Sequence, residues 1–207
     1  MDLTLTLPPA LAAVSGLNAM AHAVEALYAP DGNPVTALMA EEAVAALGRS
    51  LPRVVADPAD RAARSDALYG AWLAACCLGA VGMGLHHKLC HALGGGFGLP
   101  HAETHAVVLP YAVAFNAPAA PGAMARVARA LGTTEAATAL WELGRRLGAP
   151  PSLAAIGLRE ADLDRAVALA TGAPYPNPRP VTPDAVRRLL ADALAGGPPT
   201  SRPQPVP

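Results

Sequence analysis

The chain has little charge and few aromatic side chains. Only 15% of its 207 residues are charged and 4% are aromatic, whereas 53% are hydrophobic. The low charge excludes disordered proteins and proteins that coat nucleic acids, because the sequences of both classes contain many charged residues and few hydrophobic ones. The 15 basic residues are balanced by 16 acidic ones, so no overall field attracts phosphate. We therefore expect a globular protein that binds no nucleic acid.

β-branched and aromatic side chains are scarce, while alanine is abundant. This composition favours helices over sheets and predicts an all-α body. A length of 207 residues corresponds to about 1.4 typical domain lengths, so one large domain with a tail is expected. We divide the chain into residues 1–8, a helical domain over 9–195 and a disordered tail over 196–207, where glycine and proline dominate.

Cysteine is also scarce. The three cysteines are Cys76, Cys77 and Cys90, and two of them are adjacent, which excludes an orderly disulfide framework and favours a reducing compartment. The residues after Met1 contain neither a basic segment nor an apolar core of the kind found in secretory signals. We expect a cytoplasmic protein.

One uncharged run reaches the length of a membrane-spanning helix. It covers nineteen residues, 67–85, and contains four glycines with no flanking basic cluster beyond Lys88. A core helix of an α-domain fits these features better than a membrane span, which is the alternative interpretation. We expect no association with a membrane.

Proline and glycine divide the rest of the chain into helices. An exception is expected at the start, where Leu3, Leu5 and Leu7 alternate with threonine and predict one short β-strand without a partner. Gly94–Gly98 should break the chain, and Pro110 should kink or split its helix. Helices are expected at about residues 15–29, 34–48, 60–82, 85–93, 101–115, 121–131, 134–147, 159–170 and 183–195.

Histidines are clustered, since five of the six lie within twenty residues of one another. They are His22, His86, His87, His91, His101 and His105. On helices, the pairs Asn18/His22, His87/His91 and His101/His105 each lie one turn apart on one face. Imidazoles with this spacing bind divalent metals and transfer protons near neutral pH. A single histidine is more often structural, but five close together predict a functional site.

Lys88 is the only lysine beside fourteen arginines. Its compact ammonium next to His87 suits a carboxylate or oxyanion of a substrate, and a solvated charge at a helix end is the alternative. Gly94–Gly96 do not form a phosphate loop, because they follow a predicted helix and match no GxGxxG or GK(S/T) pattern.

Two segments carry a resemblance to a known family. SGLNAMAHAVEALYA (residues 15–29) and GLHHKLCHALGGGFGLPHAETHAVVLPYAVAFN (84–116) resemble the iron-containing alcohol dehydrogenases and, among them, the maleylacetate reductases. NPRPVTPDAVRRLL (177–190) is similar to the closing segment of that family. The resemblance implies the helical C-terminal domain of a dehydroquinate synthase-like fold. It also implies that the strand at residues 1–8 is what remains of a boundary with a nucleotide-binding domain.

The resemblance implies metal ligands at Asn18, His22, His87 and His101, with His91 alongside. Metal-using relatives carry aspartate at the first of these positions, so the neutral amide should make binding of iron or zinc weak or absent. Maleylacetate reductases are similar to this chain in carrying asparagine there. In the family, a separate α/β domain supplies the glycine-rich cradle for the nicotinamide cofactor, so this chain offers no expected cofactor-binding residues.

The implied activity is NADH- or NADPH-dependent reduction of an enone dicarboxylate, maleylacetate to 3-oxoadipate. In that reaction Lys88 and nearby histidines would hold carboxylate or enolate charge, and His91 or His87 would protonate carbon. Two alternatives stay open. One is a metal-dependent alcohol dehydrogenase-like domain, and the other is a module without redox chemistry that acts as a non-redox enzyme or an interaction partner. We expect a homo-oligomer or an association with a nucleotide-binding domain.

Overall fold

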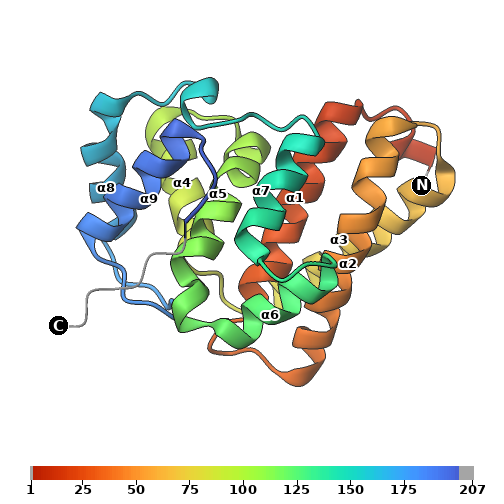
Figure 1. The fold of residues 1–207 in the computed structure, drawn as a ribbon, viewed down its shortest axis with the longest axis horizontal. Coiled ribbons are helices and arrows are strands. Elements are labelled where there is room, and N and C mark those ends of the chain that lie inside the picture. Colours follow the sequence, from red (N-terminus) through yellow and green to blue (C-terminus); the bar gives the residue numbers. More distant parts are fainter. Residues whose placement is uncertain (1, 201–207) are drawn as a thin grey trace.

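The computed structural model describes residues 2–200, and in this range the chain is helical and contains no β-strand (Figure 1). The expected all-α fold is confirmed. The α-helices are α1 (Pro9–Ala26), α2 (Pro34–Ala56), α3 (Arg61–Ala80), α4 (Leu85–Phe97), α5 (His101–Asn116), α6 (Pro121–Ala130), α7 (Ala136–Arg146), α8 (Leu163–Thr171) and α9 (Pro183–Ala195). Short 3₁₀ turns are η1 (Asp2–Thr4), η2 (Ala117–Ala119), η3 (Ala154–Ile156) and η4 (Glu160–Asp162).

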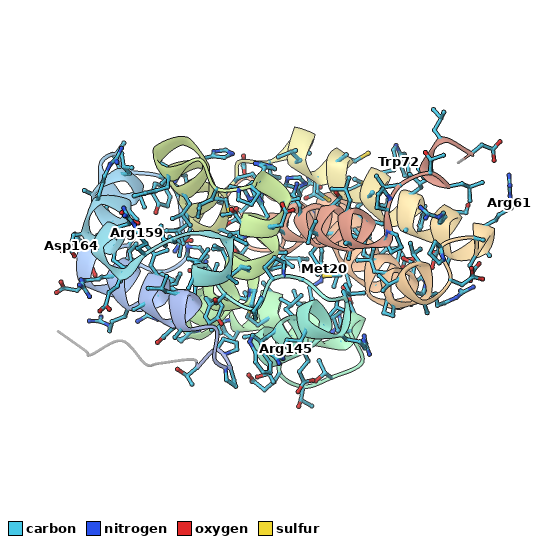
Figure 2. All side chains as sticks on the ribbon, turned by 90° about the horizontal axis from the view of Figure 1, so that it is seen from above. Met20, Arg61, Trp72, Arg145, Arg159 and Asp164 are labelled. Carbon is cyan, nitrogen blue, oxygen red and sulfur yellow. The ribbon has the colours of Figure 1, made fainter. Side chains whose placement is uncertain are left out.

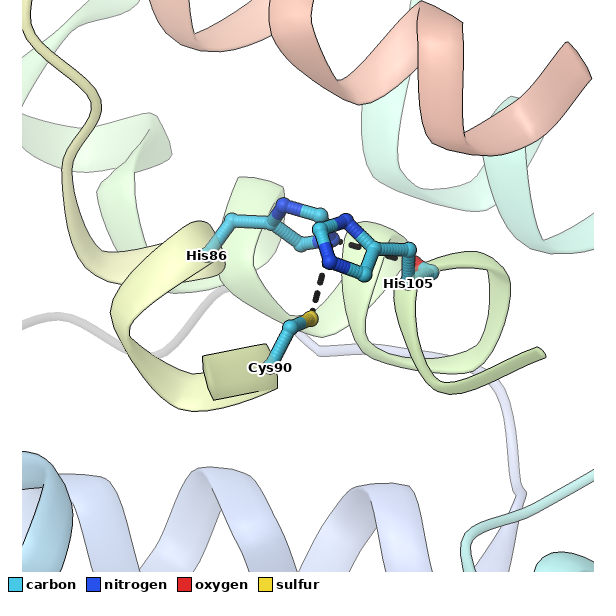
Figure 3. A group of neighbouring side chains, drawn as sticks. All are labelled: His86, Cys90 and His105. Carbon is cyan, nitrogen blue, oxygen red and sulfur yellow. Dashed lines mark hydrogen bonds between the residues drawn. The ribbon is translucent and has the colours of Figure 1, made fainter. Parts of the chain in front are cut away.

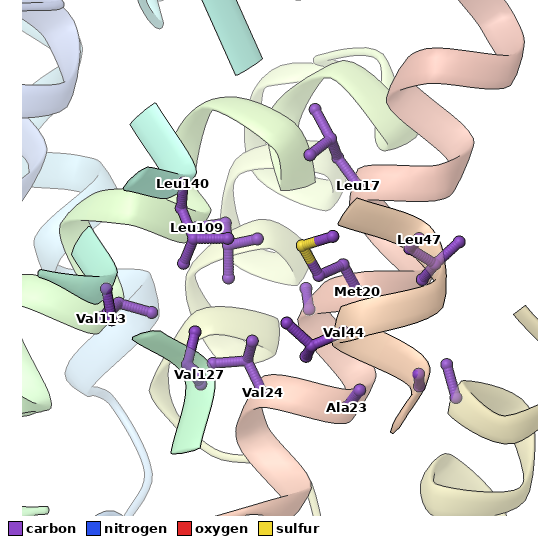
Figure 4. Close-up of a cluster of buried hydrophobic side chains, with 14 of the residues drawn as sticks. Leu17, Met20, Ala23, Val24, Val44, Leu47, Leu109, Val113, Val127 and Leu140 are labelled. Atoms are coloured by element: carbon purple, nitrogen blue, oxygen red, sulfur yellow. The ribbon is translucent and has the colours of Figure 1, made fainter. Parts of the chain in front are cut away.

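Two large hydrophobic clusters form most of the core, and α5 lies between them (Figure 1). The first cluster unites α1, α2, α3, α6 and α7, and Figure 4 shows Met20 and Leu109 facing each other within it. The second unites α4, α8 and α9. α5 is buried from Thr104 to Asn116 and gives side chains to both clusters, as expected for a helix that is apolar on every side. Figure 2 places Met20 in the interior and Arg61, Arg159 and Asp164 at the periphery.

α1 and α2 approach each other closely at Gly16. A Cβ atom at this position would lie 2.4 Å from Cδ2 of Leu51, so only glycine fits without a shift. The helix expected at 34–48 is longer in the structure, where α2 continues to Ala56 and includes Leu51. The burial of Leu51 and Val54 explains the longer helix, since their apolar surface is removed from water against neighbouring helices.

The expected strand at Leu3–Leu7 is wrong, because η1 and a turn occupy this segment. No partner strand exists among residues 2–200, so the carbonyl groups of a strand would lack donors. The side chain of Arg64, only 3% exposed, instead donates to the carbonyl oxygens of Thr4, Leu7 and Pro58. One buried guanidinium therefore holds the N-terminal turn against α3.

Two expected breaks in the chain also differ from the structure: the break expected over Gly94–Gly98 lies at Gly98 alone, and Pro110 does not split its helix. α4 continues through Gly94–Gly96 and ends at Phe97, where Gly98 adopts the left-handed conformation with φ 67°. α5 runs through Pro110 without a break. A proline inside a helix costs about 3 kcal/mol, and the packing of α5 on both sides outweighs that cost.

The apolar run 67–85 is split between α3 and α4. In the part of the chain that the structure describes, no single helix is long and apolar enough to cross a membrane; α3 and α4 reach that length and composition only together, bent by 94° at their break. All three cysteines are free thiols, as expected.

The expected disordered tail begins too early at residue 196. Trp141 Nε1 donates to the carbonyl oxygen of Gly196 at 3.2 Å, and the hydroxyl of Tyr111 donates to that of Gly197 at 2.8 Å. These bonds hold the residues just after α9 against α5 and α7. The rest of the predicted tail, residues 201–207, lies outside the described residues.

Candidate functional site

The six histidines gather where α1, α4 and α5 meet, with His87 at the centre of the group. The ring of His87 is stacked on that of His22, with centroids 4.7 Å apart, and lies 5.0 Å from the ring of His105. It is 6.2 Å from His91, one turn further along α4. His101 joins the group through His105, at a ring distance of 4.3 Å. The clustering predicted from the sequence is therefore present in space.

Glu25 on α1 orients His87. This carboxylate is fully buried and accepts a bond from Nδ1 of His87 at 2.7 Å. It also accepts the backbone N–H groups of Gly84 at 2.9 Å and His86 at 2.8 Å, which lack partners at the start of α4. Because a carboxylate only accepts, the proton of His87 resides on Nδ1 and Nε2 is left as an acceptor. One side chain therefore caps α4 and fixes the tautomer of the central imidazole.

Two of the expected ligands have unused acceptor atoms. Oδ1 of Asn18 and Nε2 of His87 are buried and have no hydrogen-bond partner. Buried acceptors without partners are costly, so a cation or a hydrogen-bond donor fits between these residues. His22 is half-buried and His101 is exposed.

The possible metal-ligand atoms of the site are not all equally close to one another. Within residues 2–200, two groups of three His, Cys, Asp or Glu side chains have donor atoms all within 4.8 Å of one another: Glu25/His86/His87 and His86/Cys90/His105. Neither group contains His22 or His101. The structure places His22 and His101 in the cluster, but their ring nitrogens do not lie within 4.8 Å of one another and of a His87 nitrogen.

Burial keeps several of these imidazoles neutral. Desolvation, followed by the electrostatic interaction with His87, lowers the pKa of His22 to about 4. The same two causes lower the pKa of His105 to about 2 and also lower the pKa of His91. Neutral imidazoles are metal ligands and hydrogen-bonding groups rather than fixed positive charges.

Lys88 supplies a positive charge at the edge of the cluster. It is half-buried, and its Nζ atom lies 5.7 Å from the centre of the Tyr175 ring. The hydroxyl of Tyr175 is buried without a partner. Burial, with the Glu25 charge, raises the pKa of Tyr175 to about 12, so this hydroxyl stays protonated at neutral pH. The Lys88 ammonium therefore lies over the ring of a tyrosine whose hydroxyl has no hydrogen-bond partner.

The loop between α8 and α9, which carries Tyr175, is fastened to the end of α5. Asn177 and Asn116 exchange two side-chain bonds, of 2.7 and 3.0 Å. Arg179 donates to the carbonyl oxygen of Phe115 at 2.9 Å and covers its ring. These contacts fix the position of the loop beside Lys88.

Sequence reasoning missed Glu25 and Tyr175. A signal for Glu25 was present, because Asn18, His22 and Glu25 follow one another at i, i+4 and i+7 and so share one face of α1. Tyr175 had no such signal, since it lies in a proline-rich loop whose path depends on contacts with α5.

Comparisons with known proteins identify the family of the chain. The model of the Fe-containing alcohol dehydrogenase family, C-terminal, matches residues 12–194. A maleylacetate reductase of Sphingobium indicum is 57% identical over 198 residues, which are 96% of this chain and 56% of that protein. The crystal structure of maleylacetate reductase from Rhizobium sp. strain MTP-10005 is 54% identical with a TM-score of 0.93, and the match covers 96% of this chain and 56% of that one.

A more distant solved structure shows the same fold. The iron-containing alcohol dehydrogenase from Corynebacterium glutamicum is 45% identical with a TM-score of 0.89, over 93% of this chain and 55% of that one. The chain spans about 56% of the length of the first curated relatives that it matches. Matching over residues 12–194 and at 57% identity, the chain belongs to the Fe-containing alcohol dehydrogenase family, of which it contains the C-terminal, helical part.

Proposed function

We propose that this chain forms the substrate-binding part of a maleylacetate reductase, which reduces the carbon–carbon double bond of maleylacetate to give 3-oxoadipate. The observation that carries the proposal is the combination of Lys88 and the unpartnered Tyr175 hydroxyl beside neutral imidazoles. Such a site suits a small dianion that develops enolate charge. Relatives that are curated as maleylacetate reductases and are 52–57% identical to the chain support this choice of substrate.

A bound NADH or NADPH would supply the hydride, which adds to the carbon β to the ketone. Lys88 holds a substrate carboxylate, and the Tyr175 hydroxyl donates a hydrogen bond to an oxygen that gains negative charge. The α-carbon then takes a proton from His91, because Glu25 holds the proton of His87 on Nδ1. The charge of Lys88 is one cause of the lowered pKa of His91, so a carboxylate bound to Lys88 offsets that effect and favours the protonated imidazole.

A divalent metal would be held by Asn18, His22, His87 and His101 and would act as a Lewis acid on a substrate oxygen. The unused acceptors of Asn18 and His87 fit a cation. The amide at position 18 brings no charge, so iron or zinc binds weakly. We therefore assign substrate polarisation chiefly to Lys88 and Tyr175.

We also propose that the nicotinamide cofactor binds only together with a nucleotide-binding domain supplied separately from residues 1–207. Within residues 2–200 the structure contains no strand, turn and helix of the kind that cradles a pyrophosphate. Exposed apolar side chains on α3 offer a contact surface for such a domain or for a second copy of the chain: Leu68, Tyr69, Trp72 and Leu78. Figure 2 shows Trp72 on the outside of this helix. The cytoplasmic location expected from the sequence stays a prediction.

Calorimetric titration with 3-oxoadipate tests the substrate site without cofactor. We expect the chain to bind this product, and Lys88→Gln to weaken binding about 10- to 100-fold, because a bond between charged groups contributes about 1.5–3 kcal/mol. Arg145→Gln is the matched control, since Arg145 also covers an aromatic ring, that of Trp141 at 5.0 Å. Equal affinities of the wild type and Lys88→Gln would contradict the proposed role. Metal-dependent binding of a simple alcohol instead would favour the alcohol dehydrogenase alternative.

A further inference from the structure

The inner side of the histidine cluster contains a thiol. His86 and Cys90 lie one turn apart on α4 and face His105 on α5, as Figure 3 shows. Sγ of Cys90 is 3.6 Å from Nε2 of His86, and donor atoms of the three residues all lie within 4.8 Å of one another. The exposed fractions are 0% for His86, 2% for Cys90 and 1% for His105. No residue of the expected metal site belongs to this group.

The spacing of these atoms matches tetrahedral coordination. With bonds of about 2.3 Å to sulfur and 2.0–2.1 Å to nitrogen, the two ligand atoms on a zinc ion are about 3.6 Å apart. Cys90 and His86 have this separation before any ion is bound. The pair needs no large rearrangement to chelate.

His105 gives an independent reason to expect a ligand. Both of its ring nitrogens are buried, and neither has a hydrogen-bond partner. An imidazole normally uses both nitrogens when it is buried, because each unpaired polar atom costs about 1–3 kcal/mol. A metal ion bound to one nitrogen would remove part of that cost. His105 also contacts the exposed His101, at a ring distance of 4.3 Å.

We propose that His86, Cys90 and His105 form a second cation site, which is specific for a thiophilic divalent ion such as Zn²⁺. Binding releases the thiol proton of Cys90 to solvent. His86 exchanges its contact with the carbonyl oxygen of His105, 3.0 Å from Nε2, for the ion and carries its proton on Nδ1. The nearby carboxylate of Glu25 helps to balance the charge. Sulfur in this set distinguishes the site from the outer one, whose expected ligands contain only nitrogen and oxygen.

Titration of the 207-residue chain with Co²⁺ tests the proposal, because thiolate bound to Co²⁺ gives an ultraviolet charge-transfer absorption that nitrogen and oxygen ligands do not give. We expect this absorption in the wild type and in His22→Ala, which removes an outer ligand. Cys90→Ser should abolish it. Cys77→Ser is the matched control, since Cys77 is also a fully buried thiol but contacts the carbonyl oxygen of Thr36 instead of a histidine.

A measurement on the wild type alone keeps the proposal testable if Cys90→Ser does not fold. The ¹¹³Cd resonance of the cadmium-loaded chain should lie in the range for one sulfur with nitrogen ligands. A resonance typical of nitrogen and oxygen ligands only would refute the site. So would a Co²⁺ charge-transfer absorption that is missing in the wild type or unchanged in Cys90→Ser.

Discussion

Glu25→Gln removes one charge from the centre of the molecule without changing its size. The carboxylate accepts five bonds, from Gly84 N, His86 N, His87 N, His87 Nδ1 and the Tyr28 hydroxyl. A glutamine side chain has one acceptor and one donor end, so in either orientation at least one buried N–H at the start of α4 faces another donor. An unsatisfied donor costs about 1–3 kcal/mol and a lost bond to a charged group about 1.5–3 kcal/mol. We expect a loss of about 3 kcal/mol in the free energy of unfolding.

Urea denaturation followed by far-ultraviolet circular dichroism measures this loss. Glu41→Gln is the matched control, because Glu41 is bound to Arg126 and Arg129 at the surface, where such pairs contribute about 1 kcal/mol or less. Nitrogen chemical shifts of His87 should in addition show a proton on Nδ1 in the wild type. A stability change of Glu25→Gln no larger than that of the control would refute the central role of this carboxylate.

Three further predictions concern pH, metal and cofactor. Folding lowers the pKa of His22 to about 4 and that of His105 to about 2, so below the ordinary value of 6.5 the unfolded chain binds more protons than the folded one. Stability therefore falls as pH drops from 6.5 towards 4, by about 1.4 kcal/mol per pH unit for the buried His105 and by less for the half-buried His22. Urea midpoints between pH 4.5 and 7.5 measure this, and a flat profile would contradict it. Asn18→Asp should raise the affinity for Zn²⁺ about tenfold or more, because it adds an anionic ligand; equal retention of zinc after dialysis would argue against this reasoning. The 207-residue chain by itself should bind NADH weakly, which nicotinamide fluorescence tests, and micromolar binding with turnover of maleylacetate would mean that a cofactor site exists within these residues.

Features that depend on the local pattern of residues could be predicted from the sequence. The histidine cluster followed from i, i+4 spacing, and the expected helix 183–195 has the bounds of α9, which Thr182 caps and Gly196 ends in the structure. The strand at Leu3–Leu7 was predicted wrongly because alternation of apolar and polar residues does not reveal whether a partner strand exists. The guanidinium of Arg64, 57–60 residues away, decided the conformation there.

Contacts between distant segments explain the other omissions. From the sequence, Cys90 was considered only for disulfides, because its neighbour His105 lies on a different helix. The pairing of Asn116 with Asn177, which places Tyr175, joins side chains 61 residues apart. No single-residue pattern encodes such contacts, and they determine which polar atoms of the site keep a partner.

The central position of α5 has a consequence for how the molecule unfolds. Because this helix contributes Leu109 and Val113 to one cluster and Val108 and Phe115 to the other, neither cluster loses its packing without exposing apolar surface of the other. The two halves are thereby coupled into a single cooperative unit. A destabilising change at the far end of α2 lowers the melting temperature of the histidine cluster as much as that of its own surroundings. The geometry of the site is then lost in one step with the whole fold rather than by local fraying.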